Sequence, residues 1–152
     1  MNRPVATPRD GTFIRLSERF PHERSRVWRA LTDPVLLARW LMPNDFRLEL
    51  GHEFTFEGPP IPAVGHDGIA YCRVLDFEPE RFLTISFGSR GASQLASTIT
   101  WTLTSQPDGG TEVTLLHHGF DPDNPMHQLS RRTMGSGWPA VLRGLGRVAG
   151  EL

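Results

Sequence analysis

Apolar residues alternate as in β-strands through the middle of the sequence, and near its end they recur at the spacing of a helix. From residue 46 to residue 117 apolar residues recur at every second position, in runs separated by Gly, Pro, Asp and Ser, which is typical of antiparallel strands joined by short turns. From Trp138 to Leu152 the apolar spacing changes to three and four, which predicts one amphipathic helix. The alternating runs predict strands within 11–20, 46–50, 54–56, 69–77, 83–87, 99–103 and 113–117.

Two short helices are predicted between the first strand and the later ones. Apolar residues at helical spacing indicate the first helix within 23–32. Asp33 is a favoured N-cap and Pro34 suits the first helical position. A second helix therefore starts there and ends before Pro43, because proline disfavours helical geometry at the preceding residue. Each helix carries one tryptophan, Trp28 or Trp40.

The order of these elements predicts a sheet that curves around one helix. A helix is about 10 Å wide and neighbouring strands lie about 4.8 Å apart, so one helix covers six or seven strands only if the sheet curls around it. We therefore expect an α+β fold with a curved six- to seven-stranded antiparallel sheet wrapped around a long C-terminal helix. A tail of residues 1–11 precedes a single domain of residues 12–152. An apolar space remains between sheet and helix, and Trp28 and Trp40 close one end of it.

Charge and cysteine content exclude several classes of function. The formal net charge is −1 with acidic and basic residues interspersed, which is not the electrostatic footprint of a protein that binds nucleic acid or an anionic membrane. No apolar run reaches the ~18 residues of a membrane-spanning helix, and the first residues lack the apolar middle of a signal peptide. Cys72 is the only cysteine, which rules out an internal disulfide. We expect a cytoplasmic protein without a metal or a cofactor.

Four segments together resemble the heat-shock-protein ATPase activator homologue (Aha-type) domain of the START-like, helix-grip superfamily. They are RFPHERSRVWRALTDPVLLARWLMP, VLDFEPERFLTISF, STITWTLTSQPDGGTEVTLLHHGF and GWPAVLRGL. The resemblance covers about residues 12–152 and implies a helix-grip fold. Relatives in the superfamily bind lipids, sterols, plant hormones or polyketides in the central cavity, and a minority catalyse cyclisation or hydration there.

The family name comes from a co-chaperone with a separate N-terminal domain that stimulates the chaperone and has no counterpart in this sequence. The resemblance therefore favours a carrier or sensor of a small molecule. A stress-related role and a chaperone partner are its further implications.

Ten residues form the candidate lining of the cavity. They come from the strands and the helix that should face each other, and they combine large apolar side chains with a few polar ones, as most ligand pockets do. They are Phe54, Phe56, Tyr71, Phe87, Trp101, Leu115, His117, Trp138, Leu142 and Leu145. The alternative is a closed core in which these residues pack together without a cavity. The Pro- and Gly-rich segment 57–68 is expected to form a lid over the mouth.

His117 and His118 are neighbours on a predicted strand, so they face opposite sides of the sheet. His117 continues the face of Val113 and Leu115 and is expected to point inward. There it orients a ligand oxygen or acts as a general base. The alternative is a structural histidine whose ring is held by hydrogen bonds.

The sequence favours Tyr71 over Cys72 as the inward residue of its strand but leaves the choice open. The inward face would then consist of Ile69, Tyr71, Arg73, Leu75 and Phe77, three of which are large and apolar. An inward Arg73 would bind an anionic group of a ligand or a buried carboxylate, whereas at the rim it would form a surface salt bridge. If Cys72 faces inward, Tyr71 is exposed to solvent.

These observations predict a binder of a small apolar or amphipathic molecule, a carrier or sensor with no catalytic residue, acting as a monomer or homodimer. One alternative is a cyclase or hydrolase of a polyketide-like substrate, which requires His117 and a second polar group at one cavity. The other is a chaperone-interacting protein, which requires an exposed interface instead.

Overall fold

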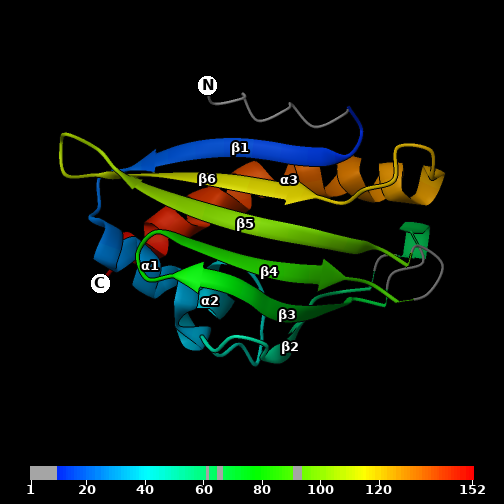
Figure 1. Cartoon of the computed structure of the whole chain (residues 1–152), viewed down its shortest axis with the longest axis horizontal. Helices are drawn as coiled ribbons and strands as arrows, with labels where there is room; N and C mark the ends of the chain where they lie inside the picture. The colour runs from blue at the N-terminus through cyan, green and yellow to red at the C-terminus, as the bar shows by residue number, and fades with distance from the viewer. Residues whose placement is uncertain (1–9, 61, 65–66, 91–93) are drawn as a thin grey trace, which may run out of the picture.

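The structure, a computed structural model, describes residues 10–60, 62–64, 67–90 and 94–152. Its elements follow the predicted order of one strand, two short helices, further strands and a C-terminal helix (Figure 1). They are β1 (Phe13–Phe20), α1 (Arg24–Thr32), α2 (Pro34–Trp40), β2 (Glu53–Glu57), the 3-10 helix η1 (Pro62–Val64), β3 (Ile69–Glu78), β4 (Phe82–Gly88), β5 (Ala96–Ser105), β6 (Thr111–His118) and α3 (Pro125–Gly150).

The strands form one open antiparallel sheet with the order β1-β6-β5-β4-β3-β2. Figure 1 shows α3 crossing behind β1, β6 and β5, and α1 and α2 contact α3 on the same side of the sheet. This arrangement confirms the α+β, helix-grip architecture. The sheet has six strands in the described part of the chain, the lower of the two numbers expected.

Alternation along β5 separates the core from the solvent. Ile99, Trp101 and Leu103 are buried, whereas the threonines between them lie on the outer face. Thr84 of β4 and Thr100 of β5 join their hydroxyls across that face at 2.9 Å. The period of two therefore decides which side chains meet the helix.

The predicted strand at 46–50 is wrong. Phe46 is buried as expected, but the segment between α2 and β2 is irregular, with an isolated bridge at Asn44. The Asn44 side chain accepts a hydrogen bond from the Phe46 backbone N–H at 3.0 Å, and the Asp45 carboxylate accepts one from Thr55 N–H at 2.8 Å. These side chains take up backbone groups that a strand would pair, which is how Asn and Asp compete with a ladder.

The C-terminal helix is longer than the sequence analysis predicts. α3 has 26 residues and begins at Pro125, where the Asn124 side chain accepts hydrogen bonds from Met126 N–H and His127 N–H. The helix continues through Pro139. The predicted start at Trp138 is therefore wrong, because the helix begins at an Asn-Pro cap equivalent to the Asp33-Pro34 cap of α2.

Glycines bring α3 close to β1 and α2. A Cβ added at Gly146 would lie 2.3 Å from the Phe20 ring, and one at Gly144 would lie 3.3 Å from Cβ of Trp40. Glycine lowers helix stability relative to alanine by about 1 kcal/mol. Here that cost is offset by close packing, which leaves Leu142, Leu145 and Val148 fully buried.

Trp28 and Trp40 both lie in the core, where α1 and α2 meet α3. Trp40 donates its indole N–H to the Ala30 carbonyl at 2.9 Å and packs edge-on against Trp101, with ring centroids 6.4 Å apart. Two helices of nine and seven residues are thereby locked to each other and to the sheet.

The substitution Gly146→Ala should lower the free energy of unfolding by about 1–3 kcal/mol, because the added methyl group overpacks the contact with Phe20. The matched control is Gly137→Ala in the same helix, where an added Cβ meets nothing within 4 Å. That control should raise stability by up to about 1 kcal/mol through helix propensity alone. Urea denaturation of both variants measures the difference, and equal effects would contradict the packing argument.

Candidate functional site

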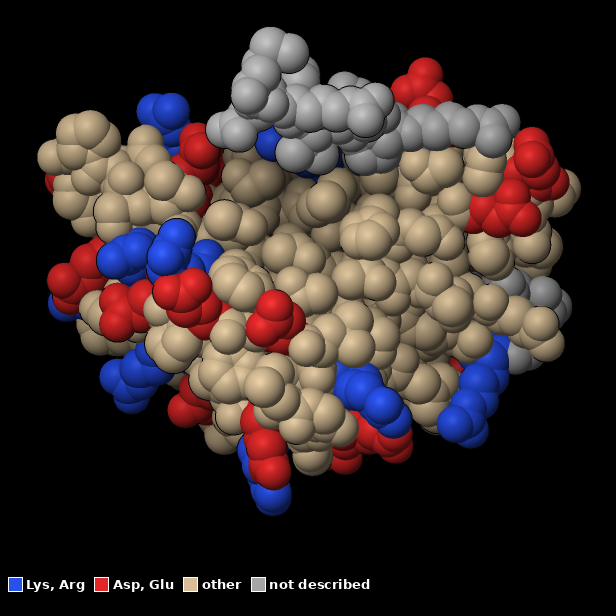
Figure 2. Space-filling view, in the orientation of Figure 1, with Lys and Arg blue, Asp and Glu red and all other residues tan. Residues whose placement is uncertain are grey.

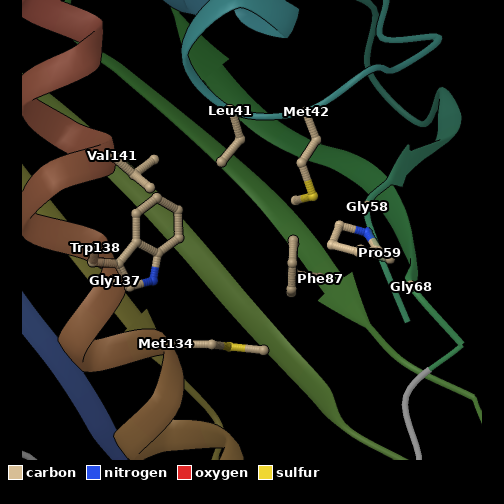
Figure 3. Close-up of a pocket in the computed structure, with 11 residues that line it drawn as sticks. Leu41, Met42, Gly58, Pro59, Gly68, Phe87, Met134, Gly137, Trp138 and Val141 are labelled. Atoms are coloured by element: carbon tan, nitrogen blue, oxygen red, sulfur yellow. The ribbon is translucent and has the colours of Figure 1, made fainter. Parts of the chain in front are cut away.

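An apolar pocket of about 220 Å³ lies between the sheet, α3 and the segments that flank β2 (Figure 3). Nearly all of the surface that it exposes is carbon and sulfur. Its walls are formed by Leu41, Met42, Gly58, Pro59, Gly68, Ala70, Phe87, Met134, Gly137, Trp138 and Val141. This pocket combines an apolar lining with space for several water molecules.

The helical wall follows from the period of α3. Met134, Gly137, Trp138 and Val141 are spaced by three and four residues and therefore share one face of the helix. Opposite them, Met42 follows the end of α2 and extends its thioether toward the same space (Figure 3). Methionine side chains are flexible and polarisable, so this part of the wall can adapt to an occupant.

Backbone geometry at the mouth requires glycine. Gly58 donates its N–H to the Gly68 carbonyl at 2.7 Å, and Gly68 has φ +88°. A Cβ at Gly68 would lie 2.2 Å from the Gly58 carbonyl oxygen, so no other residue fits there. The predicted lid, segment 57–68, includes residues 61, 65 and 66, which lie outside the described residues, but its ends at Gly58, Pro59 and Gly68 do form pocket wall.

Behind the pocket runs a chain of three hydrogen bonds. Trp138 donates its indole N–H to Nδ1 of His117 at 3.2 Å, and Nε2 of His117 lies 2.7 Å from the Ser97 hydroxyl. Ser97 in turn donates to the Phe87 carbonyl at 2.6 Å. His117 is fully buried, and Ser97 is 3% exposed.

The donors fix the tautomer of His117. An indole N–H can only donate, so Nδ1 must accept and the ring proton of neutral His117 must be on Nε2, from which it is donated to Ser97. Protonation of Nδ1 would place a second N–H donor against the Trp138 N–H. Burial, and to a smaller degree the neighbouring His118, lower the pKa of His117 to about 3. His117 is therefore neutral at physiological pH, and both of its ring nitrogens are occupied.

The ten predicted lining residues do not form one site. Phe87 and Trp138 line the apolar pocket, and His117 lies directly behind it as the inward-facing residue that the alternation predicts. Six others lie in closed core and are at most 3% exposed; they are Phe54, Phe56, Trp101, Leu115, Leu142 and Leu145. The void beside Phe54, Phe56 and Trp101 has no space for a water molecule. At these six positions the alternative of a packed core holds.

The predicted inward orientation of Tyr71 is wrong. Ala70, Cys72 and Val74 face the core, because Cys72 pairs with Phe87 and Val74 pairs with Ile85. A register shift between Val74 and Asp76 inserts one extra residue into β3. Phe77 therefore also packs against the core, although it lies three residues after the inward-facing Val74. The bulge therefore explains the error. Strict alternation places Tyr71 on the same face as Phe77, whereas the extra residue between them puts the two on opposite faces.

Tyr71 and Arg73 lie on the outer face of the sheet instead. The Arg90 guanidinium stacks over the Tyr71 ring at 3.8 Å, and Arg73 forms a surface ion pair with Glu53. Both residues border a polar groove of about 390 Å³ that is separate from the apolar pocket. Cys72 is buried, and desolvation, followed by the charge of Asp45, raises the pKa of its thiol.

Sequence reasoning missed most of the pocket wall. Met42 and Met134, two of the four methionines, and Gly137 lie there. A helical stripe extended toward the Asn124 cap would have included Met134 and Gly137, because both share the face of Trp138 and Val141. Leu41 and Met42 carry no such signal, since the chain is irregular where α2 ends.

The described residues contain no cluster of three or more His, Cys, Asp or Glu side chains that could hold a metal ion. Within the same residues, no helix combines the length and apolar character needed to cross a bilayer.

The chain is similar to known proteins both in sequence and in structure. A family model described as "Activator of Hsp90 ATPase homolog 1-like protein" matches residues 21–150. No curated protein matches the chain significantly.

Several solved structures have the same fold. The protein MLL2253 from Mesorhizobium loti is 28% identical with a TM-score of 0.80, over 91% of this chain and 97% of that one. CalU16 from Micromonospora echinospora is 26% identical with a TM-score of 0.69, over 90% of this chain and 75% of its own. DynU16, a protein of the dynemicin biosynthetic locus, is 22% identical with a TM-score of 0.72, over 92% of this chain and 47% of its own. This chain spans about half the length of DynU16.

Acidification should destabilise the protein through His117. In the unfolded chain this histidine takes up a proton near its ordinary pKa of 6.5, whereas in the folded protein it stays neutral down to about pH 3. The unfolded state therefore binds more protons across this range, and stability should fall as the pH is lowered from 6.5 toward 3, by up to about 1.4 kcal/mol per pH unit.

Denaturation measured at several pH values tests this slope in the wild type and in His117→Gln. The glutamine variant should lose it, and the exposed neighbour His118→Gln should keep most of it. A His117→Gln variant with an unchanged slope would refute the assignment.

Proposed function

The chain belongs to the Activator of Hsp90 ATPase homolog 1-like family, and from this premise we propose that it binds a small apolar or amphipathic molecule in the pocket between the sheet and α3. The role is that of a carrier or sensor. The observation that carries the proposal is the apolar pocket lined by Met42, Phe87, Met134 and Trp138.

The lining selects for apolar groups. Almost no polar atom faces the pocket, and the indole N–H of Trp138 is already donated to His117. A polar group of a ligand that entered would lose its hydrogen bonds to water without replacement, which costs several kcal/mol in an apolar environment. The part of the ligand that enters is therefore hydrocarbon or aromatic.

The size of the pocket limits the part of the ligand that is buried. Its volume is about 220 Å³, below the roughly 300–1,000 Å³ of pockets that enclose a drug-sized ligand. A small molecule would fit completely, and a larger one would bury one apolar end. A polar end would then lie near Gly58 and Pro59, where the chain is more exposed than at Phe87 or Trp138.

The geometry does not favour the alternative of a cyclase or hydrolase that uses His117 as its base. Both nitrogens of His117 are engaged and the ring is fully buried behind the pocket wall. A general base must reach the proton that it removes, directly or through one water molecule. The alternative of a chaperone partner rests on the family description.

Native mass spectrometry of the protein purified from its own host, followed by extraction with organic solvent, tests the proposal directly. We expect an excess mass that organic solvent removes. Protein without any such mass, and without affinity for added naphthalene or 1-octanol, would overturn it.

Filling the pocket should abolish binding. The substitution Gly137→Leu places a side chain at a position where a Cβ meets nothing within 4 Å, so it should reduce affinity for naphthalene at least tenfold, equal to about 1.4 kcal/mol, without unfolding the protein. Ala140→Leu, an exposed position on the same helix, is the matched control and should bind as the wild type does. Calorimetric titration measures both, and equal affinities would place the ligand elsewhere.

A further inference from the structure

The hydrogen-bond chain behind the pocket begins and ends on residues that line it. Trp138 supplies the first donor from α3, and Phe87 supplies the last acceptor from β4. His117 and Ser97, on the neighbouring strands β6 and β5, lie between them. Two walls that belong to different elements are thus joined through His117.

Packing alone does not hold the Trp138 indole in place. One side of the ring borders the pocket (Figure 3), so on that side the ring is less closely packed by the described residues. On the other side it contacts Trp101 and His117 edge to face, with ring centroids 6.2 and 6.1 Å apart. Among the described residues, the hydrogen bond to Nδ1 of His117 is the directional contact of the indole, and it fixes the rotation of the ring about its side-chain bonds.

His117 is itself held on every side. Its Nε2 is paired with Ser97, and its ring packs against Phe87 at 5.5 Å and Phe120 at 4.8 Å between centroids. A residue held in this way can transmit a fixed orientation to a neighbour. A histidine that acts as a general base presents an unprotonated nitrogen to the proton that it removes, whereas here the unprotonated nitrogen, Nδ1, faces the Trp138 N–H.

We propose that His117 is a positioning residue that sets the shape and selectivity of the pocket by holding the Trp138 indole, an inference that rests on the function proposed above. It acts through the Trp138 N–H and does not touch the ligand. The competing explanation is that His117 only fills the core, in which case its loss lowers stability without changing which ligands bind.

Three substitutions separate these explanations. His117→Leu removes the hydrogen bonds to Trp138 and Ser97 and fills the space with an apolar side chain. His117→Gln can still accept from Trp138 through Oε1 and donate to Ser97 through Nε2. Trp138→Phe keeps an aromatic wall but removes the donor through which His117 acts, so it serves as the background in which His117→Leu should have no further effect.

Two probes of different shape report selectivity. Naphthalene is flat and rigid and depends on the orientation of the indole, whereas 1-octanol is slender and flexible. We expect His117→Leu to change the ratio of their dissociation constants by about three- to tenfold, as the loss of one hydrogen bond allows. His117→Gln should keep the ratio near that of the wild type, and His117→Leu should leave it unchanged in the Trp138→Phe background.

The indole ¹H–¹⁵N resonance of Trp138 gives a readout that does not need a ligand. It is identified as the resonance absent from Trp138→Phe, and it should move in His117→Leu and return toward its wild-type position in His117→Gln. If His117→Leu does not fold, Ser97→Ala, which removes the partner of Nε2, takes its place in both measurements.

The possible results separate the two proposals. An unchanged probe ratio together with an unmoved Trp138 resonance would overturn the positioning role, even if both probes bind well. The same holds if His117→Leu changes the ratio equally in the Trp138→Phe background. If neither probe binds the wild type but the resonance moves as expected, His117 does hold the Trp138 indole in place. In that case the proposed binding function is refuted for these ligands, and the positioning role is not.

Discussion

The close approach of α3 to β1 and α2 is the contact on which the rest of the structure depends. Gly146 lies against the Phe20 ring and Gly144 against Trp40, so the C-terminal half of the helix sits deep against the sheet and the short helices. Toward its N-terminal end the same helix presents Met134 and Gly137 to an unfilled space. One rigid helix therefore has a tightly packed half that supplies stability and another half that leaves a cavity.

Charged side chains of the described residues lie at the surface and not in the buried core. Figure 2 shows an outer face whose centre carries few charges, with acidic and basic side chains gathered toward its rim. Ion pairs such as Arg19–Glu112 and Arg73–Glu53 lie on the surface, where such pairs contribute little to stability. The polar groups that matter most for the site are buried ones, His117 and Ser97, because in a medium of low dielectric a satisfied network specifies one arrangement of its side chains.

Two errors of prediction have identifiable physical causes. The Asp33-Pro34 cap correctly placed the start of α2, and the equivalent Asn124-Pro125 cap marks the start of α3, 13 residues before the apolar stripe that predicted the helix begins at Trp138. In β3 one extra residue between Val74 and Asp76 interrupts the alternation of faces, so Tyr71 lies on the outer face although Phe77 packs against the core. A bulge does not follow from local preference, because it depends on the neighbouring strands that accommodate it.

The sequence by itself determined the order of the elements, the antiparallel sheet, the single long helix and the inward face of β6 with His117, because these follow from periods of two and 3.6 residues and from caps within a few residues. Only the tertiary structure decided that six predicted lining residues fill a closed core, and that the pocket lies instead beside Met42, Met134 and Trp138. It also decided that the partner of His117 is Trp138. The physical reason is that voids and buried hydrogen bonds join residues distant in the chain, and no local pattern records how their side chains pack.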